Sequence, residues 1–206
     1  MNLDLFSSDN EGQTIDIPDG NLFIYPNFYD AVEADKYFQQ LLQTISWQQE
    51  KISMYGKTHN VPRLSAWYGD EGKTYQYSGI RTEAIQWTAL LLAIKEKIET
   101  VSDYKFNSVL VNQYRNGKDG VAWHSDDEPE LGKNPVIASL SFGEERLFQL
   151  KHKRNKNLKK SFTLPHGSLL VMGENTQLNW LHQLPKSQRS MEPRINLTFR
   201  LVNSLV

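Results

Sequence analysis

The N-terminal half of the chain shows helical spacing of apolar side chains after one short apolar run. The run at residues 22–25 predicts a strand. Asp30 follows and is predicted to cap a helix, because apolar positions recur every three or four residues after it. The predicted buried face of this helix consists of Ala34, Tyr37, Phe38, Leu41, Leu42 and Ile45. A second helix is predicted on the same spacing from about Thr82 to Val101.

From residue 106 onward the pattern changes to short apolar runs separated by Gly, Asn, Asp and Pro. These runs predict strands at residues 106–114, 136–142, 146–150, 161–164, 168–172 and 195–202. Several short strands at such spacing are typical of a jelly roll, or double-stranded β-helix. We therefore predict an α+β fold in which the two helices cover one outer face of a jelly-roll core. Residues 1–20 are polar and are expected to form a weakly ordered extension, with one domain over residues 21–206.

The composition restricts both the chemistry and the location. The chain has 206 residues and no cysteine, so disulfides, zinc–thiolate sites and iron–sulfur clusters are excluded. No apolar run approaches the length of a membrane span. The first residues lack the basic start and apolar core of a signal peptide. We expect a cytoplasmic protein without a membrane partner, and a monomer.

The net charge is −1, but six basic residues gather between Lys151 and Lys160 and leave −7 on the rest of the chain. A concentrated basic strip can follow nucleic-acid phosphates even when the total charge is near neutral. The alternative interpretation is a solvated hairpin tip.

His124 and Asp126 lie two residues apart just after a strand-like run. On an extended chain they project from the same face, so one metal ion can take both. Asp127 would face the opposite way. His182, between Trp180 and Pro185, is predicted as the third ligand, at a strand end where a loop could aim it inward. Two imidazoles and one carboxylate are the facial triad of non-haem Fe(II) oxygenases.

The other histidines fit structural roles better. His166 adjoins a glycine and is expected in a turn, His152 lies in the basic strip, and His59 lies in a polar loop. A single histidine is more often structural than a metal ligand, so His182 is predicted as a ligand only because His124 and Asp126 accompany it.

Arg194, Asn196, Thr198 and Arg200 share parity, so on a strand all four face the same side. Such a polar face needs partners if it is buried, and a dicarboxylate co-substrate would supply them. Because six residues of strand span roughly 20 Å, Arg194 is the preferred anchor, and the two arginines would have to lean together to share a short ligand. Asn112 and Tyr114 could complete this site. The alternative is the outward polar face of an edge strand.

Over about residues 50–202 the chain resembles the AlkB family of Fe(II)/2-oxoglutarate dioxygenases, and within it the type of the second and third human homologues. The resemblance rests on Tyr55-Gly56-Lys57, Val61-Pro62-Arg63, Tyr68-Gly69-Asp70, Asn112-Gln113-Tyr114 and residues 74–79, 124–128, 138–143, 166–170 and 194–200. It implies a jelly-roll core with Fe(II) held by His124, Asp126 and His182. It also implies 2-oxoglutarate gripped at its carboxylates by Arg194 and Arg200, with the polar residues named above completing the site.

The activity implied by the resemblance is oxidative demethylation of alkylated DNA bases such as 1-methyladenine and 3-methylcytosine. O2 and 2-oxoglutarate are consumed, and formaldehyde, succinate and CO2 are released. The methyl group lies on the pairing edge, so the base must be flipped out of a duplex. Residues of about 50–80 would form a lid over it.

By similarity, Tyr77 stacks on the flipped base against His124, and Tyr75 and Asp127 contact the base or its neighbours. Met54, Tyr55 and Gly56 match a finger that enters the duplex, with core packing as the alternative for the first two. Arg63 would support this loop or bind phosphate. The finger carries Met and Tyr here, which leaves the choice between duplex and single strands open, and Leu181 replaces a residue that is often aromatic in relatives.

Two alternatives to DNA demethylation remain. A related dioxygenase could act on RNA or protein with the same chemistry. A non-enzymatic jelly-roll binding module is the alternative of a different class, against which all three metal ligands and both arginines argue.

Overall fold

The computed structural model describes residues 12–54, 56–72, 74–77 and 80–203, with the backbone alone at residues 53–54, 74–77 and 80–82. An eight-stranded sheet has the order β1-β2-β14-β11-β16-β9-β5-β8. Its strands are β1 (Gln13–Ile17), β2 (Gly20–Tyr25), β5 (Leu64–Gly69), β8 (Ile85–Gln86), β9 (Ser108–Tyr114), β11 (Ile137–Gly143), β14 (Leu169–Met172) and β16 (Arg194–Arg200). The pairs are antiparallel except for β5 with β8.

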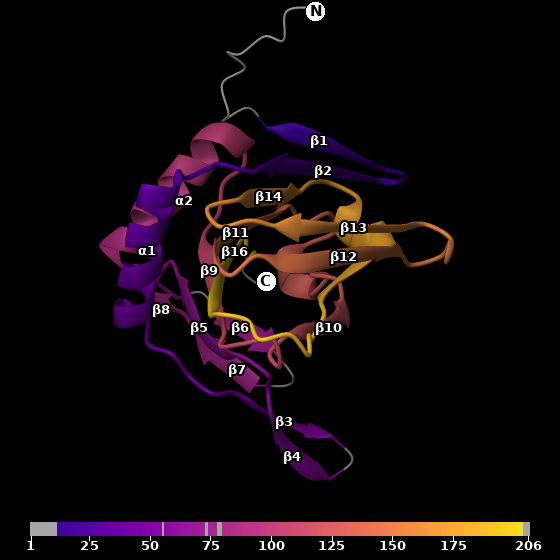
Figure 1. The fold of residues 1–206 in the computed structure, drawn as a ribbon. Coiled ribbons are helices and arrows are strands. Elements are labelled where there is room, and N and C mark those ends of the chain that lie inside the picture. Colours follow the sequence, from indigo (N-terminus) through magenta and orange to yellow (C-terminus); the bar gives the residue numbers. More distant parts are fainter. Residues whose placement is uncertain (1–11, 55, 73, 78–79, 204–206) are drawn as a thin grey trace, which may run out of the picture.

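A four-stranded antiparallel sheet faces the eight-stranded one, in the order β10-β15-β12-β13 (Figure 1). Its strands are β10 (Val121–His124), β12 (Arg146–His152), β13 (Lys159–Leu164) and β15 (Trp180–Leu184). An apolar cluster that includes Trp67, Ile137, Phe148 and Leu170 joins the two sheets. Two facing sheets of this kind form the predicted jelly roll.

Two helices, α1 (Ala31–Thr44) and α2 (Ala89–Ser102), run along one outer side of the eight-stranded sheet (Figure 1). Leu41 of α1 and Ile94 of α2 belong to the same buried cluster as Phe142 and Leu197 of the sheet. This arrangement confirms the predicted helix layer. The cap is confirmed as well, since Asp30 accepts a hydrogen bond of 2.8 Å from the Glu33 amide.

The predicted start of the second helix is wrong. Residues 80–83 form β7 (Ile80–Glu83), which pairs with β6 (Thr74–Tyr77), and β8 follows. Helix α2 begins only after Thr88, whose hydroxyl accepts a hydrogen bond of 3.2 Å from the Leu91 amide. Tertiary pairing of β7 therefore overrides the apolar spacing, and the helix begins where Thr88 caps it.

The segment expected as a weakly ordered extension, residues 1–20, includes regular structure. Residues 13–17 form β1, which pairs with β2, while residues 1–11 lie outside the described part of the chain. The remaining short elements are the hairpin of β3 (Lys51–Met54) and β4 (Lys57–Asn60), the 3-10 helix η1 (Pro129–Leu131) and the short helix α3 (Thr176–Asn179). Among the described residues, no helix is both long and apolar enough to cross a membrane.

Strand β16 shows how the fold positions polar groups. It lies in the middle of the sheet between β11 and β9, and all seven of its residues are buried. Ile195, Leu197 and Phe199 pack into the cluster beneath the helices. The alternate residues must therefore face the interior between the two sheets. The edge-strand alternative for this segment is wrong.

Candidate metal centre and co-substrate pocket

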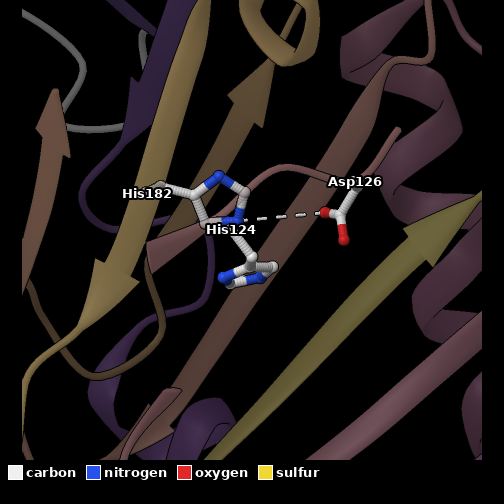
Figure 2. A group of neighbouring side chains, drawn as sticks. All are labelled: His124, Asp126 and His182. Carbon is white, nitrogen blue, oxygen red and sulfur yellow. Dashed lines mark ion pairs between the residues drawn. The ribbon is translucent and has the colours of Figure 1, made fainter. Parts of the chain in front are cut away.

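His124, Asp126 and His182 come together between the sheets. Each offers a ligand atom, and these atoms all lie within 4.8 Å of one another. Figure 2 shows the three side chains converging, with the 3.9 Å contact between His182 Nε2 and Asp126 Oδ2 drawn as a dashed line. Because the jelly roll brings β10 beside β15, His124 and His182 are direct cross-strand partners. His182 thus lies within β15, not at the strand end that we expected.

The protonation states favour metal binding. Burial, together with the neighbouring His124, lowers the pKa of His182 to about 3, so its imidazole is neutral near pH 7. Burial alone would raise the pKa of Asp126, but the charge of Arg200 and its hydrogen bond help to outweigh burial, and the pKa is lowered. A neutral imidazole and an ionised carboxylate are the forms that coordinate a cation.

Neighbouring groups orient the two imidazoles. His124 Nδ1 lies 2.8 Å from the carbonyl oxygen of Ala122; since a carbonyl only accepts, this contact places the proton on Nδ1 and leaves Nε2 for a ligand bond. The Phe148 ring stacks on His182 at a centroid distance of 5.5 Å. Arg200 donates from Nη2 to Asp126 Oδ1 at 2.7 Å.

The three residues open into a cavity of about 390 Å³. This volume is in the range of small-molecule sites. Residues of both sheets line it, among them Asn112, Tyr114, Arg194, Asn196, Thr198 and Arg200. The sequence-based prediction that the four polar residues of β16 share one face is therefore confirmed.

Arg194 is the unusual cation of this cavity. It is 2% exposed, and burial lowers its pKa to about 10. Its Nη2 donates to Ser141 Oγ at 2.8 Å, and the guanidinium carbon lies 5.4 Å from the centre of the Tyr114 ring. Its Nε is buried and has no hydrogen-bond partner among the described residues. A buried cation with an unused N–H donor is suited to bind an anion.

The other polar residues of the cavity bond mainly to one another. Asn196 donates to Ser139 Oγ at 2.9 Å and accepts from Thr198 Oγ1 at 3.0 Å. Arg63 donates from Nε to Asn112 Oδ1 at 2.8 Å. Arg63 is only 7% exposed, which does not fit the expected grip on DNA phosphate. Its position in the cavity wall instead braces Asn112.

The two arginines of β16 serve different ends of the cavity. Arg200 bonds to the candidate metal ligand Asp126, whereas Arg194 bonds to Ser141 at the other end of the strand. That both arginines grip one short ligand stays a prediction, and it requires them to lean together from opposite ends of the strand.

Apart from Arg63, the residues expected to contact substrate lie outside the cavity wall or outside the described residues. Asp127 is exposed and receives bonds from Ser125 Oγ at 2.7 Å and Lys153 Nζ at 3.0 Å. Burial alone would raise its pKa, but these two bonds lower it. Gly56 lies at the tip of the exposed β3–β4 hairpin with a φ of 74°. Tyr55 is not described, and nor are the side chains of Met54, Tyr75 and Tyr77.

Three neighbours were missed from the sequence: Ser141, Gln177 and Lys153. Ser141 lies on β11, in register with Asn196 of β16, and only the strand pairing reveals this. Gln177 contacts the Asp126 backbone from 51 residues away. Lys153 belongs to the basic strip, so its charge was noted, but its use on Asp127 was not.

The geometry agrees with a family comparison. Residues 21–200 match the family model described as the 2OG-Fe(II) oxygenase superfamily. The chain belongs to this superfamily. As a member it is expected to use Fe(II) and 2-oxoglutarate, the pair for which the histidine–carboxylate group and the buried arginine provide the matching ligand types.

Curated relatives place this oxygenase among AlkB homologues. The "Alpha-ketoglutarate-dependent dioxygenase alkB homolog 3" of Bos taurus is 46% identical over 86% of this chain and 64% of its own length. The human protein of that name is 45% identical over 87% of this chain and 65% of its own length. The "DNA oxidative demethylase ALKBH2" of Mus musculus is 39% identical over 86% of this chain and 79% of its own length. The chain thus spans just under two thirds of the length of the first two.

A solved structure described as "The structure of OsALKBH1" has the same fold. It superimposes with a TM-score of 0.66 at 14% identity, covering 92% of this chain and 100% of the other. At this identity the likeness concerns the fold alone, and it supports the jelly-roll architecture.

Proposed function

We propose that this oxygenase is an oxidative demethylase of N-alkylated nucleobases in DNA, acting on lesions of the 1-methyladenine and 3-methylcytosine type. The observation that carries the proposal is the cavity in which a histidine–aspartate–histidine group meets the buried Arg194, whose Nε has no partner within the described part of the chain. The printed names of the relatives, which include "DNA oxidative demethylase", support the choice of DNA.

His124, Asp126 and His182 would hold Fe(II). The fit rests on the donor set and on the 4.8 Å limit within which the three ligand atoms lie. Three protein ligands leave positions open for a co-substrate and O2. With Fe(II) and 2-oxoglutarate bound, the site would supply oxidation of the N-methyl carbon, with release of formaldehyde, succinate and CO2.

Arg194 would bind the distal carboxylate of 2-oxoglutarate. Its guanidinium is buried in the cavity and keeps a donor for a second bond. Tyr114 packs beside it, and Asn112 lies on the same strand two residues earlier. Arg200 would act at the metal end, where it fixes the orientation of Asp126 and contributes positive charge toward the co-substrate. Asn196 and Thr198 would shape the wall between the two arginines through their mutual bond.

Apolar side chains of the same cavity would exclude water from the reacting atoms. Leu110, Phe148 and Met172 line it beside the metal centre. A dry surrounding strengthens the ionic contacts of Arg194 and of Asp126. Asp127, exposed next to Asp126, carries a lowered pKa and would accept a hydrogen bond from the exocyclic amino group of the flipped base.

Two hairpins would handle the nucleic acid. The β3–β4 hairpin carries Met54, Tyr55 and Gly56 and projects away from the sheets (Figure 1), as a finger entering the duplex would require. The β6–β7 hairpin carries Tyr75 and Tyr77, which would stack on the extruded base. The basic strip of residues 151–160 lies at the exposed end of β12 and β13 and would follow phosphates.

Formaldehyde release tests this proposal. The protein with Fe(II), ascorbate and 2-oxoglutarate would be given matched oligonucleotides carrying 1-methyladenine or 3-methylcytosine, as duplex DNA, single-stranded DNA and RNA, with a methylated peptide as control. Release from DNA above RNA and peptide supports the proposal, and the reverse order favours the RNA or protein alternative. Failure to form succinate with any of them would point to a binding module. A monomer in the cytoplasm stays a prediction.

A further inference from the structure

The candidate ligand Asp126 lies on a segment without regular secondary structure. Residues 125–128 follow the end of β10 and precede η1, and no strand among the described residues pairs with them. Asp126 itself is 2% exposed, so its backbone N–H needs a partner from elsewhere in the fold. Arg200 orients only the carboxylate. The backbone beneath that carboxylate is held by a different group.

Gln177 supplies the partner. Its Oε1 accepts a hydrogen bond of 2.9 Å from the Asp126 amide, and its Nε2 lies 3.5 Å from Met172 Sδ. Gln177 is 1% exposed and belongs to α3, which leads directly into β15. His182 is on β15, so a single side chain links the segment of the carboxylate ligand to the element that carries one of the histidines.

Lys153 closes the same link from outside. Its Nζ donates to the Gln177 carbonyl oxygen at 2.8 Å and to Asp127 Oδ2 at 3.0 Å. Its backbone amide donates to the Asn179 carbonyl oxygen at 2.7 Å. Lys153 therefore differs from its neighbours on the basic strip, because its ammonium group bonds to both α3 and the 125–128 segment and so joins them.

We propose that Gln177 is a positioning residue for the metal centre, held in place by Lys153, and that it sets metal affinity by fixing the backbone of Asp126 relative to His182. The inference rests on the proposed iron site. Groups that orient metal ligands without touching the metal typically change metal affinity 10- to 100-fold when they are lost. A backbone anchor two bonds from the ligand's side chain is such a group.

The test is Mn²⁺ binding by the purified full chain, measured by electron paramagnetic resonance of free Mn²⁺, without O2 or substrate. Gln177→Leu keeps the side-chain size and removes the acceptor; we expect its dissociation constant to rise about tenfold. Thr176→Val is the matched control. Thr176 is equally buried in α3, but its hydroxyl bonds to Asn21 instead of the Asp126 segment, so Mn²⁺ affinity should stay within about twofold of the parent.

A second pair of variants tests the proposal if Gln177→Leu does not fold. Lys153→Met removes the ammonium of the link and should weaken Mn²⁺ binding about threefold, whereas Lys156→Met removes the same charge from the exposed hairpin tip and should not. The inference is overturned if Gln177→Leu binds Mn²⁺ with parental affinity. It is also overturned if Gln177→Leu and Thr176→Val, or Lys153→Met and Lys156→Met, lose the same Mn²⁺ affinity. A parent chain that does not bind Mn²⁺ would instead refute the proposed metal site itself.

Discussion

Replacing Arg194 by Met would separate binding of the co-substrate from stability of the fold. The guanidinium is buried, and its pKa falls from 12.5 to about 10, which corresponds to a cost on the order of 3 kcal/mol in the folded state. Because the folded-state pKa is the lower one, the cost is present below about pH 10 and disappears as the pH rises towards 12.5. Met fills a similar volume without charge, so at neutral pH the ligand-free variant should be at least as stable in urea as the parent.

Binding of 2-oxoglutarate should reverse this order and make the parent more stable than the variant. Two hydrogen bonds from a guanidinium to a carboxylate contribute about 1.5–3 kcal/mol each, so the variant should bind 2-oxoglutarate roughly 10²- to 10⁴-fold more weakly. Thermal unfolding with Mn²⁺, with and without 2-oxoglutarate at about 100 times the parental Kd, is the assay. The ligand stabilises the parent by about 2.7 kcal/mol there. For a chain of this size that raises Tm by about 5–10 °C, and the variant should show a rise of about 1 °C or less.

Arg189→Met is the matched control, because Arg189 is exposed and its loss should leave the ligand-induced rise in Tm intact. The reasoning fails if Arg194→Met binds 2-oxoglutarate with parental affinity. It also fails in its stability part if the ligand-free variant unfolds at clearly lower urea concentrations than the parent.

Asp126→Ala should abolish Mn²⁺ binding and succinate release by removing the only anionic member of the group, whereas Asp16→Ala, which removes an exposed carboxylate of β1, should keep both; iron-dependent succinate release by Asp126→Ala would contradict this. Replacing Met54 and Tyr55 together by Ala should reduce formaldehyde release from duplex DNA more than from single strands, and equal losses would count against the finger. The pKa of Asp119 is lowered, since hydrogen bonds from Arg115 outweigh the effect of burial. Asp119→Asn should therefore lose about 1–3 kcal/mol of stability at neutral pH. This difference should shrink in urea unfolding as the pH falls through the folded-state pKa, below about 4; a constant difference would exclude the ionised carboxylate as its source.

Local patterns predicted the elements whose periodicity is strong. The run at residues 136–142 appears as β11, and the run at 195–202 appears as β16, each shifted by a residue or two. The helix capped by Asp30 was predicted for a physical reason that the structure repeats. In contrast, residues 82–88 were included in the predicted second helix, but residues 82–83 belong to β7, because pairing with β6 decides their conformation.

The candidate ligands were predicted because their chemistry is local. His124 and Asp126 are two apart, so on an extended chain they project from the same face, and one metal ion can take both. Gln177 offers no such signal. An amide in a short helix becomes meaningful only when the fold places it 2.9 Å from a buried backbone N–H.

By itself the amino-acid order determined which side chains can bind a cation or an anion, and the strand parity that turns four polar residues of β16 to one face. Only the tertiary structure decided which partner each of those groups binds. Antiparallel pairing of β11 and β9 with β16 brings Ser141 to Arg194. The opposite end of the same strand brings Arg200 to Asp126. Partners of this kind are chosen by register between distant strands, and register depends on packing that no local pattern contains.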